Sequence, residues 1–121
     1  MSISVLICDD SNMARKQVLR SLPESLSENV KLAKNGLEAL DILRKEPVDL
    51  MFLDLTMPEL DGVGVLTELQ GNGIDCPIFV ISADIQPEMQ NKVIELGAKA
   101  FLRKPVNTEL LHSTLKEHGI I

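Results

Sequence analysis

Five short apolar runs, each followed by a longer segment with helical spacing, constrain the fold of this chain more than any other feature. The first, third and fourth runs are almost continuously apolar, which is typical of strands buried on both faces of a sheet. The second run alternates apolar and polar residues, which indicates a half-exposed strand at a sheet edge. We therefore predict strands over residues 3–8, 29–34, 48–54, 76–82 and 100–103.

The segments between these runs have helix boundary signals in suitable places. The helix predicted over residues 11–22 ends before Pro23, which cannot continue it. Asn35 is placed to cap the second helix, and Pro87 to open the fourth. The third helix follows the loop that contains Pro58, and the fifth begins near Thr108.

A strand–helix pattern repeated five times predicts a parallel sheet with helices on both faces. The most apolar strands belong at the centre and the alternating second strand at one edge. This favours an α/β, doubly wound, five-stranded sheet in the order 2-1-3-4-5, with five helices. The 121 residues fit a single domain spanning residues 1–121, with no linker or repeat.

Polar side chains follow four of the predicted strands. Asp9 and Asp10 follow the first strand, Asp54 ends the third, Ser82 ends the fourth and Lys104 follows the fifth. In an open parallel sheet, ligands bind beyond the carboxyl ends of the strands, where the strand order reverses. We therefore expect these five side chains to converge at one edge.

This set of groups indicates metal-assisted phosphoryl chemistry. Three adjacent carboxylates need a cation, and oxygen ligands suit Mg²⁺. The backbone carbonyl of Thr56 is a further candidate ligand. Lys104 and Ser82 are placed to contact phosphoryl oxygens, and Asp54 is the best candidate nucleophile, forming an aspartyl phosphate.

Each residue also has a purely structural interpretation. Asp9 or Asp10 is about as well suited to cap the first helix as to bind a metal. A single serine or lysine at such a position is usually a turn residue or a solvated charge. The shared site is favoured because all of these residues follow strands on one side of the sheet. Asp61 and Gly62 are interpreted as turn residues.

Composition narrows the possible partners and the compartment. A net charge of −6, from 18 acidic and 12 basic residues, argues against a general binder of nucleic acids or anionic membranes. No run is long enough for a membrane span, and the N-terminus lacks the features of a signal peptide. Cys8 and Cys76 are isolated, which suits a reduced, cytoplasmic protein.

The chain resembles the receiver domain of two-component response regulators, and in size the stand-alone CheY-like proteins. The resemblance covers nearly the whole chain. It rests on four segments: LICDDSNMAR (6–15), DLMFLDLTMPELDG (49–62), VISA (80–83) and GAKAFLRKP (97–105).

The resemblance implies that Asp54 accepts a phosphoryl group from the phosphohistidine of a histidine kinase. It implies Mg²⁺ binding by Asp10 directly, by Asp9 directly or through water, and by Asp54 and the Thr56 carbonyl.

For the remaining residues, the resemblance implies that Ser82 and Lys104 contact the phosphoryl group. Phe101 matches a switch aromatic that turns inward as Ser82 moves, although a tyrosine is frequent there. The Lys104–Pro105 bond is expected to be cis. Signalling output is expected from the surface formed by the fourth helix, the fifth strand and the fifth helix.

The leading hypothesis is a phosphorylation-dependent switch rather than a turnover enzyme. Because the chain ends soon after the fifth helix, no output domain is expected, and the switch would act on a downstream protein partner or phosphatase, for example in chemotaxis. A phosphorelay intermediate feeding a histidine phosphotransfer protein is an open alternative. A small Mg²⁺-dependent phosphatase of the haloacid dehalogenase type and a degenerate binding scaffold are less favoured.

Overall fold

The computed structural model describes residues 3–57 and 59–121; residues 1–2 and Pro58, in the predicted loop, lie outside the described residues. The chain alternates strands and helices as predicted, with one additional turn of 3-10 helix, η1. The elements are β1 (Ser4–Cys8), α1 (Asn12–Ser21), η1 (Glu24–Leu26), β2 (Asn29–Ala33), α2 (Gly36–Lys45), β3 (Leu50–Leu53), α3 (Gly62–Gly71), β4 (Ile78–Ser82), α4 (Pro87–Glu95), β5 (Ala100–Arg103) and α5 (Thr108–Glu117).

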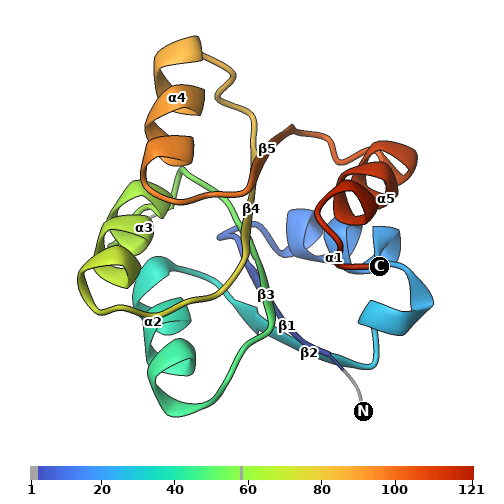
Figure 1. Ribbon diagram of the computed structural model, residues 1–121, viewed down its shortest axis with the longest axis horizontal. Helices are drawn as coiled ribbons and strands as arrows, with labels where there is room; N and C mark the ends of the chain where they lie inside the picture. The colour runs from blue at the N-terminus through green and yellow to red at the C-terminus, as the bar shows by residue number, and fades with distance from the viewer. Residues whose placement is uncertain (1–2, 58) are drawn as a thin grey trace.

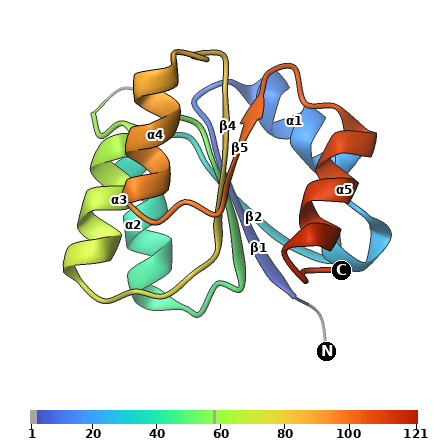
Figure 2. The ribbon, with the colours of Figure 1, turned by 45° about the horizontal axis from the view of Figure 1, so that its top comes forward.

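The five strands form one parallel sheet in the order β2-β1-β3-β4-β5, which confirms the predicted doubly wound α/β fold. Helices α2, α3 and α4 cover one face of the sheet, and α1 and α5 cover the other (Figures 1 and 2). The strand order reverses between β1 and β3, so the predicted switch point lies between these two strands.

Each sheet face has its own apolar core because neighbouring residues of a strand point to opposite faces. In β1, Leu6 and Cys8 pack with the α2, α3 and α4 side, whereas Val5 and Ile7 pack with the α1 and α5 side. Both sets are at most 1% exposed, so β1 is buried on both faces, as its continuous apolar sequence predicted.

Four helices begin at a side-chain cap, and two of these caps correct the sequence interpretation. The capping oxygen accepts a hydrogen bond from the backbone N–H three residues later, a contact typically worth about 1 kcal/mol. Ser11, rather than Asp9 or Asp10, caps α1, so neither aspartate is used as a cap. Asp61 caps α3 instead of forming an isolated turn. The capping residues and their distances are Ser11 (3.2 Å), Asn35 (2.8 Å), Asp61 (2.8 Å) and Asn107 (3.0 Å).

Strand boundaries differ from the prediction by one or two residues. β3 begins at Leu50 rather than at residue 48, and β4 begins after Pro77, which has no N–H to donate. Asp49 lies beside the start of β1, where its carboxylate accepts a hydrogen bond from the Ser4 N–H at 2.8 Å. Within the described residues, none of the helices is both long and apolar enough to cross a lipid bilayer.

Candidate functional site

The carboxyl ends of the strands bring together the three predicted aspartates. One carboxylate oxygen from each of Asp9, Asp10 and Asp54 lies within 4.8 Å of the other two. Asp9 directly follows β1 and Asp54 directly follows β3, and these strands are neighbours in the sheet. Asp9 and Asp54 are 4% and 5% exposed, whereas Asp10 faces solvent. The cluster therefore has a buried base and an open side.

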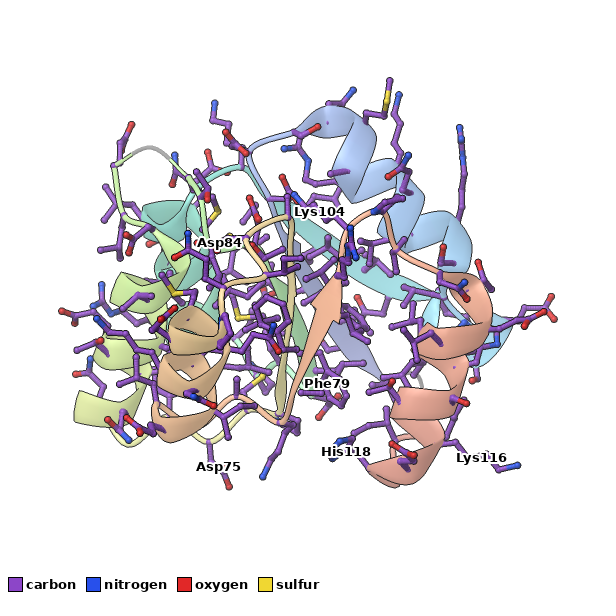
Figure 3. All side chains as sticks on the ribbon, turned by 90° about the horizontal axis from the view of Figure 1, so that it is seen from above. Asp75, Phe79, Asp84, Lys104, Lys116 and His118 are labelled. Atoms are coloured by element: carbon purple, nitrogen blue, oxygen red, sulfur yellow. The ribbon has the colours of Figure 1, made fainter. Side chains whose placement is uncertain are left out.

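Lys104 lies against this cluster. Its Nζ is 2.7 Å from Oδ2 of Asp9 and 3.3 Å from Oδ1 of Asp54. The side chain reaches the cluster from the end of β5, which points toward Lys104 and Asp84 and away from Asp75 in Figure 3. The Lys104–Pro105 peptide bond is cis, as the resemblance implied.

The electrostatics of the site follow from burial and from the crowding of like charges. Burial raises the pKa of the Asp54 carboxyl, the nearby Asp9 raises it further, and Lys104 opposes both effects. For Lys104, burial alone would lower the pKa, but its hydrogen bond to Asp9 and the charge of Asp54 raise it. Asp54 is thus a carboxylate whose charge is only partly compensated by the protein.

Ser82 is the last residue of β4 and is 1% exposed. Its Oγ accepts a hydrogen bond from the Asp84 N–H at 3.1 Å, and its backbone carbonyl accepts one from the Lys104 N–H at 2.9 Å. Within residues 3–57 and 59–121, the hydroxyl hydrogen of Ser82 has no acceptor and is available to donate. Through these two hydrogen bonds, Ser82 connects the loop after β4 to the backbone of Lys104.

Thr56 and Phe101 lie in the loop after β3 and in β5, respectively. Thr56 is exposed in the loop after β3, two residues beyond Asp54. Phe101 is half-buried in β5, pairs in register with Val80 and packs against the core on the α2, α3 and α4 side. Its side chain is therefore partly covered by this core and partly open to solvent.

Two residues with a direct part in the site geometry were missed by the sequence interpretation. Gly62 opens α3 against Asp54: a Cβ at this position would lie 2.4 Å from the Asp54 carbonyl oxygen, so only glycine fits without displacement. Arg15 donates a hydrogen bond from Nη1 to the Asp9 carbonyl oxygen at 2.6 Å. Arg15 ends one of the quoted segments, but its sequence position alone does not reveal this contact.

The cluster has the properties of a site for a hard cation. Carboxylate oxygens converge from three residues, one side is open to water, and the buried charge is not fully neutralised by Lys104. The donor set thus fits Mg²⁺, and the exposed Asp10 leaves one side of the cluster accessible to solvent.

Comparison with known proteins agrees with this arrangement. The model of the response regulator receiver domain matches residues 5–116. Response regulator MprA of Mycobacterium tuberculosis is 35% identical over 116 residues, which cover 96% of this chain and 50% of MprA. Response regulator MprA of Mycobacterium sp. strain KMS is 34% identical with the same coverage. This chain therefore spans about half the length of the curated relatives it matches.

Solved structures that include CheY proteins are also similar to this chain. Chemotaxis protein CheY4 of Vibrio cholerae aligns with a TM-score of 0.85 at 28% identity, over 97% of this chain and 98% of that one. A chain of the CheX–CheY–BeF3–Mg²⁺ complex of Borrelia burgdorferi aligns with a TM-score of 0.89 at 25% identity, over 96% and 88% of the two chains. With the strand order, the acidic cluster and the family match over residues 5–116, the chain belongs to the family of response regulator receiver domains.

Proposed function

We propose that this receiver domain is a phosphorylation-dependent signalling switch in which Asp54 accepts a phosphoryl group from the phosphohistidine of a histidine kinase. The observation that carries the proposal is the Lys104 ammonium, which contacts the carboxylates of both Asp9 and Asp54 at the switch point of the sheet. This contact supports a role for Asp54 as an oxygen nucleophile and for Lys104 as the cation that would meet an entering phosphoryl group.

Asp9, Asp10, Asp54 and the Thr56 carbonyl would hold Mg²⁺. When bound, the ion would neutralise the carboxylates and supply positive charge to the entering phosphoryl oxygens. The Borrelia complex that this chain resembles contains both BeF3 and Mg²⁺, which supports this assignment. In this chain, the assignment of the Mg²⁺ site rests on the convergence of the carboxylates of Asp9, Asp10 and Asp54.

In the proposed transfer, a carboxylate oxygen of Asp54 forms a bond to phosphorus as the bond from phosphorus to the histidine nitrogen breaks. The electron pair of that bond leaves with the imidazole. Lys104 and the Ser82 hydroxyl stabilise the phosphoryl oxygens, so the contribution of the protein is positioning and electrostatics. The switch therefore acts stoichiometrically and is not a turnover enzyme.

Phosphorylation adds negative charge beside Ser82 and Lys104, at the ends of β4 and β5. We expect Ser82 and Phe101 to rearrange in response and to change the surface formed by α4, β5 and α5. Three large apolar side chains are exposed on or next to these helices: Ile85 (43%), Ile94 (48%) and Leu110 (52%). They suit a protein partner that recognises this surface.

The test is the intact mass of the protein after incubation with a small acyl-phosphate donor, in Mg²⁺ or in chelator. The wild type should gain one phosphoryl group only with Mg²⁺, and Asp54→Asn should gain none. Asp75→Asn is the matched control, because Asp75 is exposed at the opposite end of the sheet (Figure 3). Phosphorylation of Asp54→Asn to the wild-type extent would overturn the assignment.

The partner is tested separately, by capture from a lysate with the protein loaded with Mg²⁺ and fluoroberyllate or left free. A partner retained equally in both states would contradict the switch. Phosphoryl transfer from Asp54 to a histidine phosphotransfer protein would identify a relay intermediate instead.

A further inference from the structure

All four polar atoms of Asp9 are held by neighbouring segments. Its backbone N–H donates to the Ala33 carbonyl at 3.0 Å, and its carbonyl accepts from Arg15 Nη1 at 2.6 Å. Its Oδ1 accepts from the Ser11 N–H at 2.9 Å, and its Oδ2 contacts Lys104 Nζ at 2.7 Å. Among these contacts, only the one from Arg15 comes from a charged side chain that the proposed transfer does not use.

We propose that Arg15 is a positioning residue for the metal site, an inference that rests on the proposed function. The carbonyl that Arg15 holds belongs to the peptide bond between Asp9 and Asp10. This unit is planar, so holding its carbonyl oxygen restrains ψ of Asp9. A change in ψ of Asp9 that φ of Asp10 does not offset would turn the chain after Asp9 and move Asp10 relative to Asp9. The hydrogen bond from Arg15 therefore helps to fix the spacing of two proposed ligands.

Asp10 depends most on this restraint. Its side chain is exposed, whereas Asp9 is buried and held at both carboxylate oxygens. The direction in which the Asp10 side chain projects is consequently set by the backbone conformation. A charge-assisted hydrogen bond, such as the one from Arg15, is stronger than a neutral bond and suits this purpose.

The guanidinium of Arg15 is itself anchored on the first turn of α1. Its Nη2 donates to Oδ1 of Asn12 at 3.3 Å, one helical turn earlier, while Nη1 contacts the Asp9 carbonyl. Arg15 is half-buried, in contrast to its exposed neighbour Lys16. A planar group with two fixed contacts defines the carbonyl position better than a single ammonium can.

The charge and the hydrogen bond of Arg15 have opposite effects on Mg²⁺ binding, which makes the inference testable. A positive charge near the site repels the cation, so loss of charge alone would strengthen binding. Loss of the hydrogen bond to the Asp9 carbonyl would weaken it, because the carboxylates would no longer be held in place. The direction of the change in affinity therefore separates positioning from simple electrostatics.

The experiment is a Mg²⁺ titration followed through the amide NMR signals of residues 9–11, because the chain has no Trp or Tyr. Arg15→Met should weaken Mg²⁺ binding about tenfold, the size of effect typical of a residue that orients metal ligands. Arg15→Lys should be intermediate. Lys16→Met, the matched control, should bind as tightly as the wild type or slightly more tightly. Equal thermal stability in chelator verifies that the variants fold.

Wild-type affinity or tighter binding in a folded Arg15→Met protein would overturn the inference and leave the proposed function intact. If the wild type itself does not bind Mg²⁺, the proposed metal site fails, and the role of Arg15 fails with it. If Arg15→Met does not fold, Arg15→Lys and Asn12→Ala replace it. Wild-type affinity in both of these variants would then overturn the inference.

Discussion

Nζ of Lys104 lies 2.7 Å from Oδ2 of Asp9, so an ion pair joins the end of β5 to the end of β1, although β3 and β4 lie between these strands in the sheet. Lys104 also contacts Asp54, at the longer distance of 3.3 Å. The carboxylates are almost fully buried, and the lysine is about one-quarter exposed. Lys104 therefore supplies the positive charge that offsets the cost of burying the carboxylates of Asp9 and Asp54 when no metal ion is bound.

Replacing Lys104 should consequently make stability depend on Mg²⁺. Lys104→Met leaves two buried carboxylates without their cation, which should lower the free energy of unfolding in chelator by about 1–3 kcal/mol. Saturating Mg²⁺ should restore part of this loss, because the ion binds the folded state. The measurement is urea unfolding followed by far-UV circular dichroism, with and without Mg²⁺.

The matched control for this variant is Lys116→Met, because Lys116 is exposed near the C-terminal end of α5 (Figure 3). It should unfold as the wild type does in both conditions. If Lys104→Met were as stable as the wild type in chelator, Lys104 would not be the compensating charge.

Asp54→Asn should stabilise the metal-free protein at neutral pH. Burial and the nearby Asp9 raise the pKa of Asp54, so the folded state disfavours its ionised form. The penalty is present above the raised pKa and is relieved as the pH falls toward the ordinary carboxyl value, because the folded state then binds the proton first. The gain from Asp54→Asn should therefore be largest near pH 7 and decrease in acid.

Urea unfolding of the wild type and of Asp54→Asn, in chelator and from neutral to acidic pH, measures how the stability gain depends on pH. The exposed Asp75→Asn variant should show no comparable pH-dependent gain. A difference between Asp54→Asn and wild type that does not change with pH would mean that relief of the buried charge is not its cause.

The order of the strands and the residues of the candidate site could be predicted because both follow from local patterns in the sequence. Continuous apolar runs marked the buried strands, and the alternating run marked the edge strand β2. Parallel strands place their carboxyl ends at one edge, so the residues that follow them had to meet there. The sequence therefore predicted the convergence of Asp9, Asp54 and Lys104 that the structure shows.

The contacts that position these groups could not be predicted in the same way. The hydrogen bond from Arg15 to the Asp9 carbonyl depends on the path of the backbone between β1 and α1. The approach of Gly62 to the Asp54 carbonyl depends on how α3 packs on the sheet. Backbone carbonyls carry no sequence signal, so a side chain that binds one looks like any other polar residue.

Gly36, like Gly62, lies very close to a backbone carbonyl oxygen, and this contact leads to a prediction about stability. Its N–H donates to the Leu60 carbonyl at 3.1 Å, and a Cβ at Gly36 would lie 2.3 Å from the same oxygen. Gly36→Ala must displace the loop between β3 and α3, which should lower the free energy of unfolding by about 1–3 kcal/mol. Urea unfolding measures the change.

Gly71→Ala is the matched control for Gly36→Ala. Gly71 ends α3, and a Cβ there would meet no atom within 4 Å. Because alanine favours the helix, this substitution should be neutral or stabilising by up to about 1 kcal/mol. Equal destabilisation by both substitutions would show that the contact with Leu60 is not the cause.

The two cysteines should be unreactive in the folded protein. Burial, and then the nearby Asp9 and Asp54, raise the pKa of Cys8 to about 12, and burial, followed by Asp49 and Asp75, raises that of Cys76 to about 12. Because the thiolate is the reactive form, these raised pKa values should leave very little of either thiol ionised and reactive at pH 8. An aromatic disulfide reagent at pH 8 should therefore label the folded protein far more slowly than the urea-unfolded chain, which should release two equivalents of the coloured thiol. Cys76→Ser isolates Cys8, and rapid labelling of that folded variant would contradict the burial of Cys8 against Met57.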